Sequence, residues 1–96
     1  AQALDLPLQA LTLLNDPVYV EAAKALARRV SADLPAAGAD ERLRHAFRLC
    51  LARAPSTIEL AALRALLDAQ RTARGDEAAW QAVATALLNL DEMITK

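Results

Sequence analysis

The most reactive side chains in this chain of 96 residues are one cysteine, Cys50, and one histidine, His45. A cysteine acts as a nucleophile when a nearby base removes its proton. The two residues are five positions apart, which separates them by about 140° around an α-helix. They therefore do not face each other on one helix, and the sequence favours Cys50 as a small buried apolar residue.

Haem binding is the next chemistry to consider. Covalent attachment of a c-type haem requires the motif Cys-x-x-Cys-His, and the three residues after Cys50 contain neither a second cysteine nor a histidine. His45 and Met93 are both axial-ligand types, but they lie on different expected helices, so His45 is interpreted as a solvated helix residue. One cysteine also excludes an internal disulfide and a Cys-rich zinc site. We therefore expect no metal or cofactor in this chain.

Four arginines concentrate positive charge on one expected helix: Arg42, Arg44, Arg48 and Arg53. Such a cluster could form a docking surface for an acidic partner or for another domain. The alternative is a solvated helix face, partly neutralised by Glu41 three positions before Arg44. Both interpretations stay open, and we take Arg44, Arg48 and Arg53 as candidate interaction residues.

Polar side chains near the two ends of the chain are the other candidates: Gln9, Asn15, Asp16 and Asn89. If the first and last helices pack together, the amides of Gln9, Asn15 and Asn89 could bridge buried backbone ends, which is a structural role. The adjacent carboxylates Asp91–Glu92 point about 100° apart on a helix, so they are no ready acid–base pair. The sequence therefore contains no assembled catalytic set.

The composition indicates which elements position these side chains. Hydrophobic residues make up 55% of the chain and aromatic residues 3%, and the apolar residues are mostly leucine and alanine, which favour helices. The length fits one helical domain over residues 1–96, and the apolar content excludes intrinsic disorder. The net charge of −1 argues against a nucleic-acid or anionic-membrane binder. No apolar run is long enough to span a membrane.

Capping and proline signals predict an all-α bundle of about five short helices, mostly antiparallel because the connections are short. The helices are expected to begin at Pro7, at Pro17, at a cap on Asp40, at the capping box Ser56–Glu59 and at a cap on Asp76. The inner face of the second helix should carry Val18, Ala22, Ala25, Leu26 and Val30. The last helix, with Trp80 and Leu87–Leu88, should be the central packing element.

Several segments together resemble a known family. They are residues 7–17, with the sequence Pro-Leu-Gln-Ala-Leu-Thr-Leu-Leu-Asn-Asp-Pro, followed by 46–49, 53–55, 59–60, Trp80 and 87–92. This pattern is similar to the C-terminal domain of planctomycete-cytochrome-type proteins (the PSD-one family, domain of unknown function 1553). The chain departs from the family at Ala52 and Ala54, where Gly and Glu are common, at Thr57, where Pro is common, and before Pro7.

The resemblance implies that the chain is the C-terminal part of a large exported protein, periplasmic or extracellular. The upstream domain would be a c-type haem domain or another helical domain of unknown function. We expect a non-catalytic helical packing or interaction module whose partners are those upstream domains, another protein or a second copy. A large exposed apolar patch would support this interpretation. The alternative is part of an active site that missing upstream domains complete, with Gln9, Asn15, Asp16 or the arginines lining a cleft. A third possibility is a free-standing adaptor.

Overall fold

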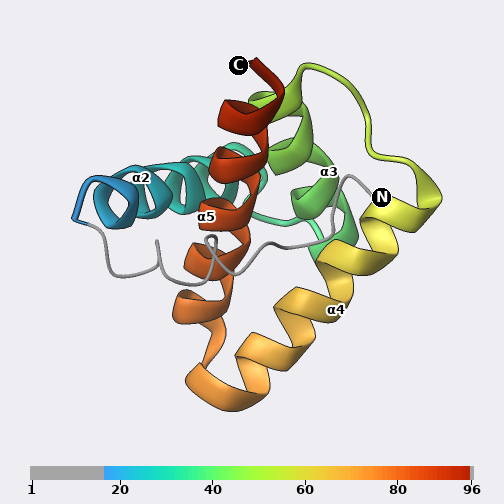
Figure 1. The fold of residues 1–96 in the computed structure, drawn as a ribbon. Helices are drawn as coiled ribbons and strands as arrows, with labels where there is room; N and C mark the ends of the chain where they lie inside the picture. The colour runs from blue at the N-terminus through green and yellow to red at the C-terminus, as the bar shows by residue number, and fades with distance from the viewer. Residues whose placement is uncertain (1–16, 96) are drawn as a thin grey trace.

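In this computed structural model, the structure describes residues 17–95, and among them the side chains of all but Tyr19 and residues 91–95. They form four α-helices: α2 (Pro17–Asp33), α3 (Ala39–Leu51), α4 (Thr57–Arg74) and α5 (Asp76–Thr95) (Figure 1). No strand occurs in this part of the chain, so the predicted all-α class is confirmed. The helix that we expect to begin at Pro7 lies outside the described residues.

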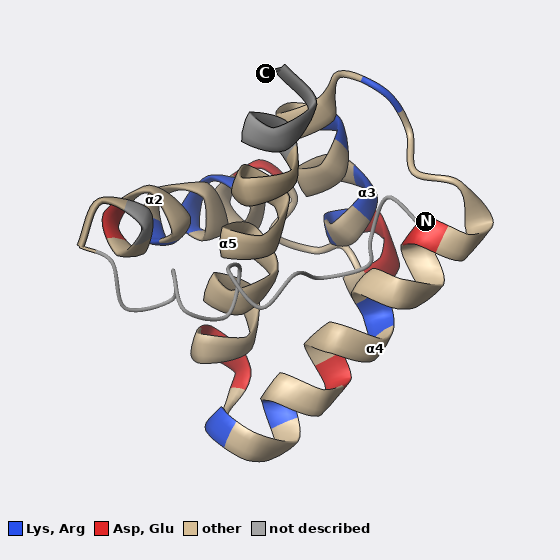
Figure 2. Ribbon diagram, in the orientation of Figure 1, with Lys and Arg blue, Asp and Glu red and all other residues tan. Residues whose placement is uncertain are grey.

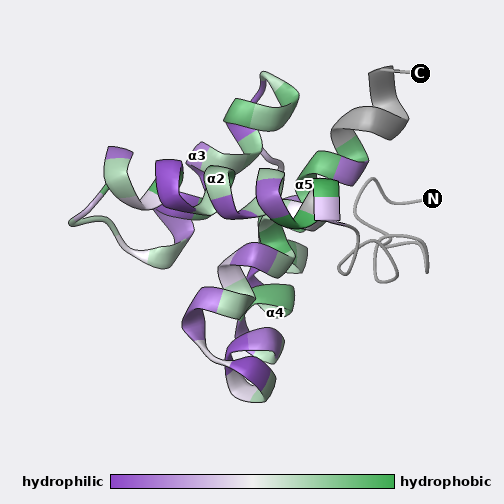
Figure 3. Cartoon of the chain, turned by 90° about the vertical axis from the view of Figure 1, so that its left-hand side faces the viewer, coloured by the Kyte–Doolittle hydropathy of each residue, from purple (hydrophilic) through white to green (hydrophobic). Residues whose placement is uncertain are grey.

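Helix α5 is the centre of the bundle, as the sequence predicts. It contacts α2, α3 and α4, whereas α2 and α4 do not touch each other. Figure 1 shows α4 and α5 running in opposite directions and diverging in a V from their shared turn, while α2 lies across α5 rather than alongside it. All six residues from 82 to 87 are buried, as expected of a helix that is covered on all sides. Figure 3 shows the corresponding concentration of apolar residues along α5.

The core joins one face of each helix. Its buried members are Val30, Leu43, Ala46, Phe47, Leu63, Leu67, Ala79, Val83 and Leu87. Burying a large apolar side chain contributes about 1.5–3 kcal/mol to the free energy of unfolding, so these residues dominate the stability. Trp80 and the half-buried Cys50 pack against the edge of this core, which agrees with the interpretation of Cys50 as an apolar residue.

The predicted inner face of α2 is partly wrong. Val18 is 75% exposed, and Ala22 and Ala25 are also exposed. The buried residues are Ala23 and Val30, seven positions apart on one stripe. Helix α2 carries two apolar stripes because it is rich in alanine, and its position across α5 decides which of them is buried.

The helix boundaries follow the sequence signals with two corrections. The capping box forms as predicted, since the Ser56 hydroxyl accepts from the Glu59 backbone N–H at 3.1 Å. The expected cap at Asp40 is wrong, because Gly38 occupies that position and no side chain bonds there. The expected cap at Asp76 is wrong as well, because the Gly75 carbonyl accepts the first helical bond, from Ala79.

Helix α3 ends in a strained conformation. Ala52 follows its last residue with a φ angle of 58°, which is the left-handed region, and its N–H donates to the Arg48 carbonyl at 2.9 Å. Glycine is the usual residue at this position because it has no Cβ to clash.

Candidate functional site

The first group of polar candidates lies at the corner between α3 and α4. The two terminal nitrogens of Arg53 donate to the two carboxylate oxygens of Glu59, each at 2.8 Å. The Arg53 guanidinium also lies over the Phe47 ring, 4.9 Å from its centroid. Glu59 accepts a further bond from the Ser56 backbone N–H at 2.8 Å. Arg53 therefore holds two helices together.

The electrostatics of this corner are strong. The hydrogen bonds from Arg53, together with the one from the Ser56 N–H, lower the pKa of Glu59 to about 2. They outweigh the partial desolvation of this carboxyl, which by itself would raise its pKa. The Glu59 side chain is 11% exposed, and that of Arg53 is 49% exposed. A carboxylate held ionised in this way is a poor proton acceptor at neutral pH, so the corner is suited to structural support rather than to acid–base chemistry.

A second polar cluster joins α2 to α3. Arg42 donates to the carbonyl oxygens of Leu34 and Pro35, each at 3.0 Å, and so satisfies the carbonyl end of α2. The His45 Nε2–H donates to the Asp33 carboxylate at 2.8 Å. This hydrogen bond lowers the pKa of Asp33, and the nearby Arg29 guanidinium lowers it further. Partial desolvation of the carboxyl acts in the opposite direction but is outweighed.

A chain of ion pairs links α3, α4 and α5. Arg64 donates to Asp40 at 2.8 Å and to Asp68 at 3.2 Å. Arg71 lies 3.9 Å from Asp68 and donates to Asp76 at 2.8 Å. Both aspartates that were expected to be caps, Asp40 and Asp76, are thus partners of arginines on α4. These exposed ion pairs connect the helices, and solvent screening keeps the contribution of each to the stability small.

Arg44 and Arg48 differ from the other candidate arginines. Both are exposed on α3, one helical turn apart, and in the part of the chain that the structure describes neither forms an ion pair within 4.0 Å. The expected pairing of Glu41 with Arg44 is not formed. Figure 2 marks the basic residues along the α3 ribbon. We name Arg44 and Arg48 the α3 arginine pair.

The remaining candidates are separated from this surface. Asn89 is 7% exposed on the central helix α5, where it forms interactions, so a structural role fits its burial. Gln9, Asn15 and Asp16 lie outside the described residues, and their proposed contacts stay predictions. Within residues 17–90, no group of three or more His, Cys, Asp or Glu side chains is arranged to hold a metal ion.

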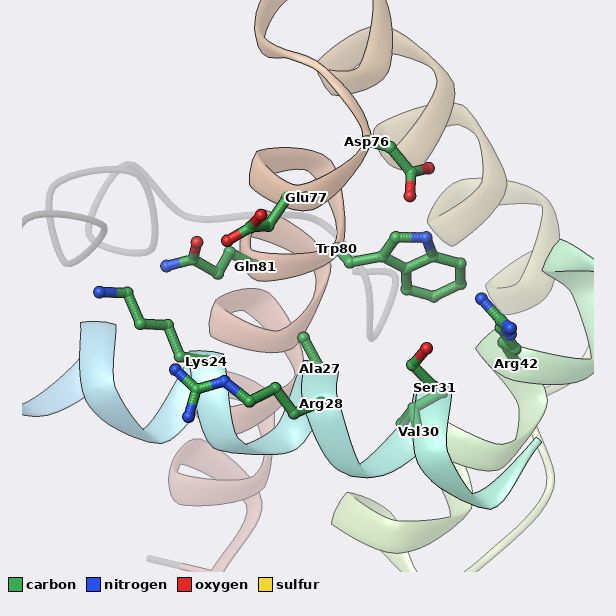
Figure 4. Close-up of a pocket in the computed structure, with 10 residues that line it drawn as sticks. All are labelled: Lys24, Ala27, Arg28, Val30, Ser31, Arg42, Asp76, Glu77, Trp80 and Gln81. Atoms are coloured by element: carbon green, nitrogen blue, oxygen red, sulfur yellow. The ribbon is translucent and has the colours of Figure 1, made fainter. Parts of the chain in front are cut away.

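A pocket lies elsewhere, between α2 and the start of α5, and we name it the α2–α5 pocket (Figure 4). Its volume is about 360 Å³. The indole ring of Trp80 forms one wall, together with Ala27 and Val30 of α2. Its polar lining consists of Lys24, Arg28, Ser31, Arg42, Asp76, Glu77 and Gln81. No motif in the sequence indicates this pocket, because its residues come from three helices, α2, α3 and α5.

Some polar groups of the α2–α5 pocket are already bonded to other groups of the chain, whereas others form no close ion pair with the described residues. Arg42 is bonded to the end of α2, and Asp76 to Arg71. Lys24 has one distant partner, Glu21 at 3.9 Å. Among the described residues, Arg28 and Glu77 form no ion pair within 4.0 Å. The pocket thus presents two cations on α2 and one carboxylate on α5 that remain able to bind.

Comparisons with known proteins identify the family. A model of the family PSD1, described as "Protein of unknown function (DUF1553)", matches residues 2–67. The match includes α2, α3 and most of α4, and it ends before Trp80 and the segment 87–92. No curated protein and no solved structure matches the chain. In the described part of the chain, no helix is both long enough and apolar enough to cross a membrane.

Proposed function

The chain belongs to the PSD1 family of proteins of unknown function (DUF1553), and on that premise we propose that it is a non-catalytic helical module. In this proposal it packs against other parts of a larger exported, cytochrome c-associated protein through the α3 arginine pair. The partner surface is acidic.

The proposal rests on a difference between arginines that are bonded within the chain and the two arginines of the α3 arginine pair. Arg42, Arg53, Arg64 and Arg71 all bond to groups that join one helix to another element of this chain. The α3 arginine pair is exposed and joins nothing in the described structure. Like charges one turn apart weaken a helix by about 0.2–0.5 kcal/mol, and an opposing carboxylate pair would remove that cost.

A large exposed apolar patch would support this proposal. The described part of the structure contains none, which counts against docking through an apolar surface. The large exposed apolar side chains there are Val18 and Ile58, at 75% and 65% exposure. They lie on α2 and α4, two helices that do not touch each other. The proposed contact is therefore electrostatic, which favours selective and salt-dependent association.

Calorimetry of the natural polypeptide that contains these residues tests the proposal. A docked module should unfold together with its partner, in one calorimetric transition. The double substitution Arg44→Glu and Arg48→Glu should split this into two transitions, one for the module and one for the remaining polypeptide. The matched control is the double substitution Arg28→Glu and Arg74→Glu, which reverses two exposed arginines on α2 and α4.

The melting temperature of the 96-residue chain with the same substitutions shows whether the module itself is still folded. A module that melts independently in the wild-type polypeptide would contradict docking. Lost activity with unchanged coupling of the transitions would favour the active-site alternative instead.

A further inference from the structure

The α2–α5 pocket is independent of the α3 arginine pair, and its chemistry points to a ligand. We propose that this pocket binds a small aromatic carboxylate. Its volume of about 360 Å³ lies within the range of small-molecule sites, about 300–1,000 Å³. Such sites combine apolar walls with a few polar groups that orient the ligand, and this pocket has both.

The apolar part of the ligand is set by Trp80. Figure 4 shows the indole of Trp80 at the pocket, above Ala27 and Val30 of α2. A flat aromatic ring can stack on an indole in an offset arrangement, and such ring pairs gain more than their buried area alone provides. The small side chain of Ala27 leaves room for a ring between the two helices.

The charge of the ligand is set by the groups that remain able to bind. Lys24 and Arg28 lie one turn apart on α2, so both cations reach the same end of the pocket. Glu77 and Glu21, which lies 3.9 Å from Lys24, offset these two cations, and Asp76 is already bonded to Arg71 at 2.8 Å. Arg42 adds a third cation, so the lining carries three cations against two carboxylates. The excess positive charge selects an anion, and an arginine guanidinium binds a carboxylate through two parallel hydrogen bonds.

The binding mode follows from these two ends. The aromatic ring lies against Trp80, and the carboxylate lies between Arg28 and Lys24. The Gln81 amide and the Ser31 hydroxyl line the same pocket and can donate further hydrogen bonds. A ligand held in this way contacts α2 and α5 together.

Trp80 is the only tryptophan, so its indole N–H gives one resolved signal in a ¹H–¹⁵N correlation spectrum. Benzoate should shift this signal in a saturable manner. Benzyl alcohol, which lacks the charge, and acetate, which lacks the ring, should bind about tenfold more weakly. Equal binding of benzoate and benzyl alcohol, or no shift with benzoate, would overturn the proposal.

Substitutions locate the site. Lys24→Gln with Arg28→Gln should weaken benzoate binding about tenfold, while Arg44→Gln with Arg48→Gln, an equal loss of charge outside the pocket, should leave it unchanged. A similar loss in both double variants would mean that net charge alone attracts benzoate, and would refute the site. The dichroism spectrum of each variant reports whether its helices are retained.

Discussion

Replacing Glu59 by glutamine removes the carboxylate that holds the α3–α4 corner. The variant loses the negative charge and one of the two 2.8 Å hydrogen bonds from Arg53, because an amide nitrogen cannot accept. Its amide oxygen can still accept from Arg53 and from the Ser56 N–H, as Oε1 of Glu59 does. The fall of the Glu59 pKa from 4.5 to about 2 sets a ceiling of about 3.4 kcal/mol on the stabilisation. Because Arg53 is half exposed, solvent screening reduces the expected loss to about 1–2 kcal/mol.

The sign of the pH dependence follows from the lowered pKa. The stabilisation by Glu59 is complete above its unfolded-state value of 4.5 and is lost as the pH falls toward about 2. The wild type and Glu59→Gln should therefore differ most at neutral pH and converge in acid. Asp33 also has a lowered pKa, but it is present in both proteins and cancels in the comparison.

Urea denaturation, followed by helical circular dichroism at several pH values, measures this difference. In a parallel thermal denaturation at neutral pH, the melting temperature of the variant should be about 4–16 °C lower, given about 4–8 °C per kcal/mol for a domain of this size. The control Glu41→Gln removes an exposed carboxylate without an ion pair and should cost about 0.5 kcal/mol or less. The reasoning is refuted if Glu59→Gln is as stable as the wild type, or if the difference does not shrink in acid.

Three further substitutions test the structural account by urea denaturation. Ala52→Gly should raise the free energy of unfolding by about 0.5–1 kcal/mol, because it relieves the left-handed backbone at φ 58°; a loss of stability would contradict that assignment. Arg42→Ala should cost about 1 kcal/mol, since two carbonyls at the end of α2 lose a donor, and an unchanged midpoint would show that water replaces it. Phe47→Ala should cost about 3–5 kcal/mol because the ring is fully buried, and a cost below about 1 kcal/mol would place it outside the core.

Much of the fold is predictable because its signals are local. The proline at the start of α2, the capping box before α4 and the glycine after it each act within one turn of helix, so they identify boundaries without tertiary information. The predicted helix caps at Asp40 and Asp76 are wrong because these side chains form contacts with another helix, which local signals do not indicate. Each carboxylate is bonded to an arginine of α4, and in the case of Asp40 that arginine is 24 positions away.

The candidate surfaces were less predictable, for a related reason. Arg44, Arg48 and Arg53 look alike in the sequence, and only the turn after α3 brings Arg53 onto Glu59. The buried stripe of α2 depends on its crossing with α5, because alanine is compatible with both a buried and an exposed position. The α2–α5 pocket forms only when α2, α3 and α5 pack together, so its residues cannot be recognised as a pocket from the sequence alone.

Amide hydrogen exchange tests most directly whether this chain is a docking module that uses α3. The exchange of residues 17–95 is compared between the chain alone and the natural polypeptide that contains it. Docking through the α3 arginine pair predicts slower exchange in the polypeptide, concentrated in α3 and absent after charge reversal of Arg44 and Arg48. Equal exchange in both forms, or slowing confined to other helices, would contradict the proposal.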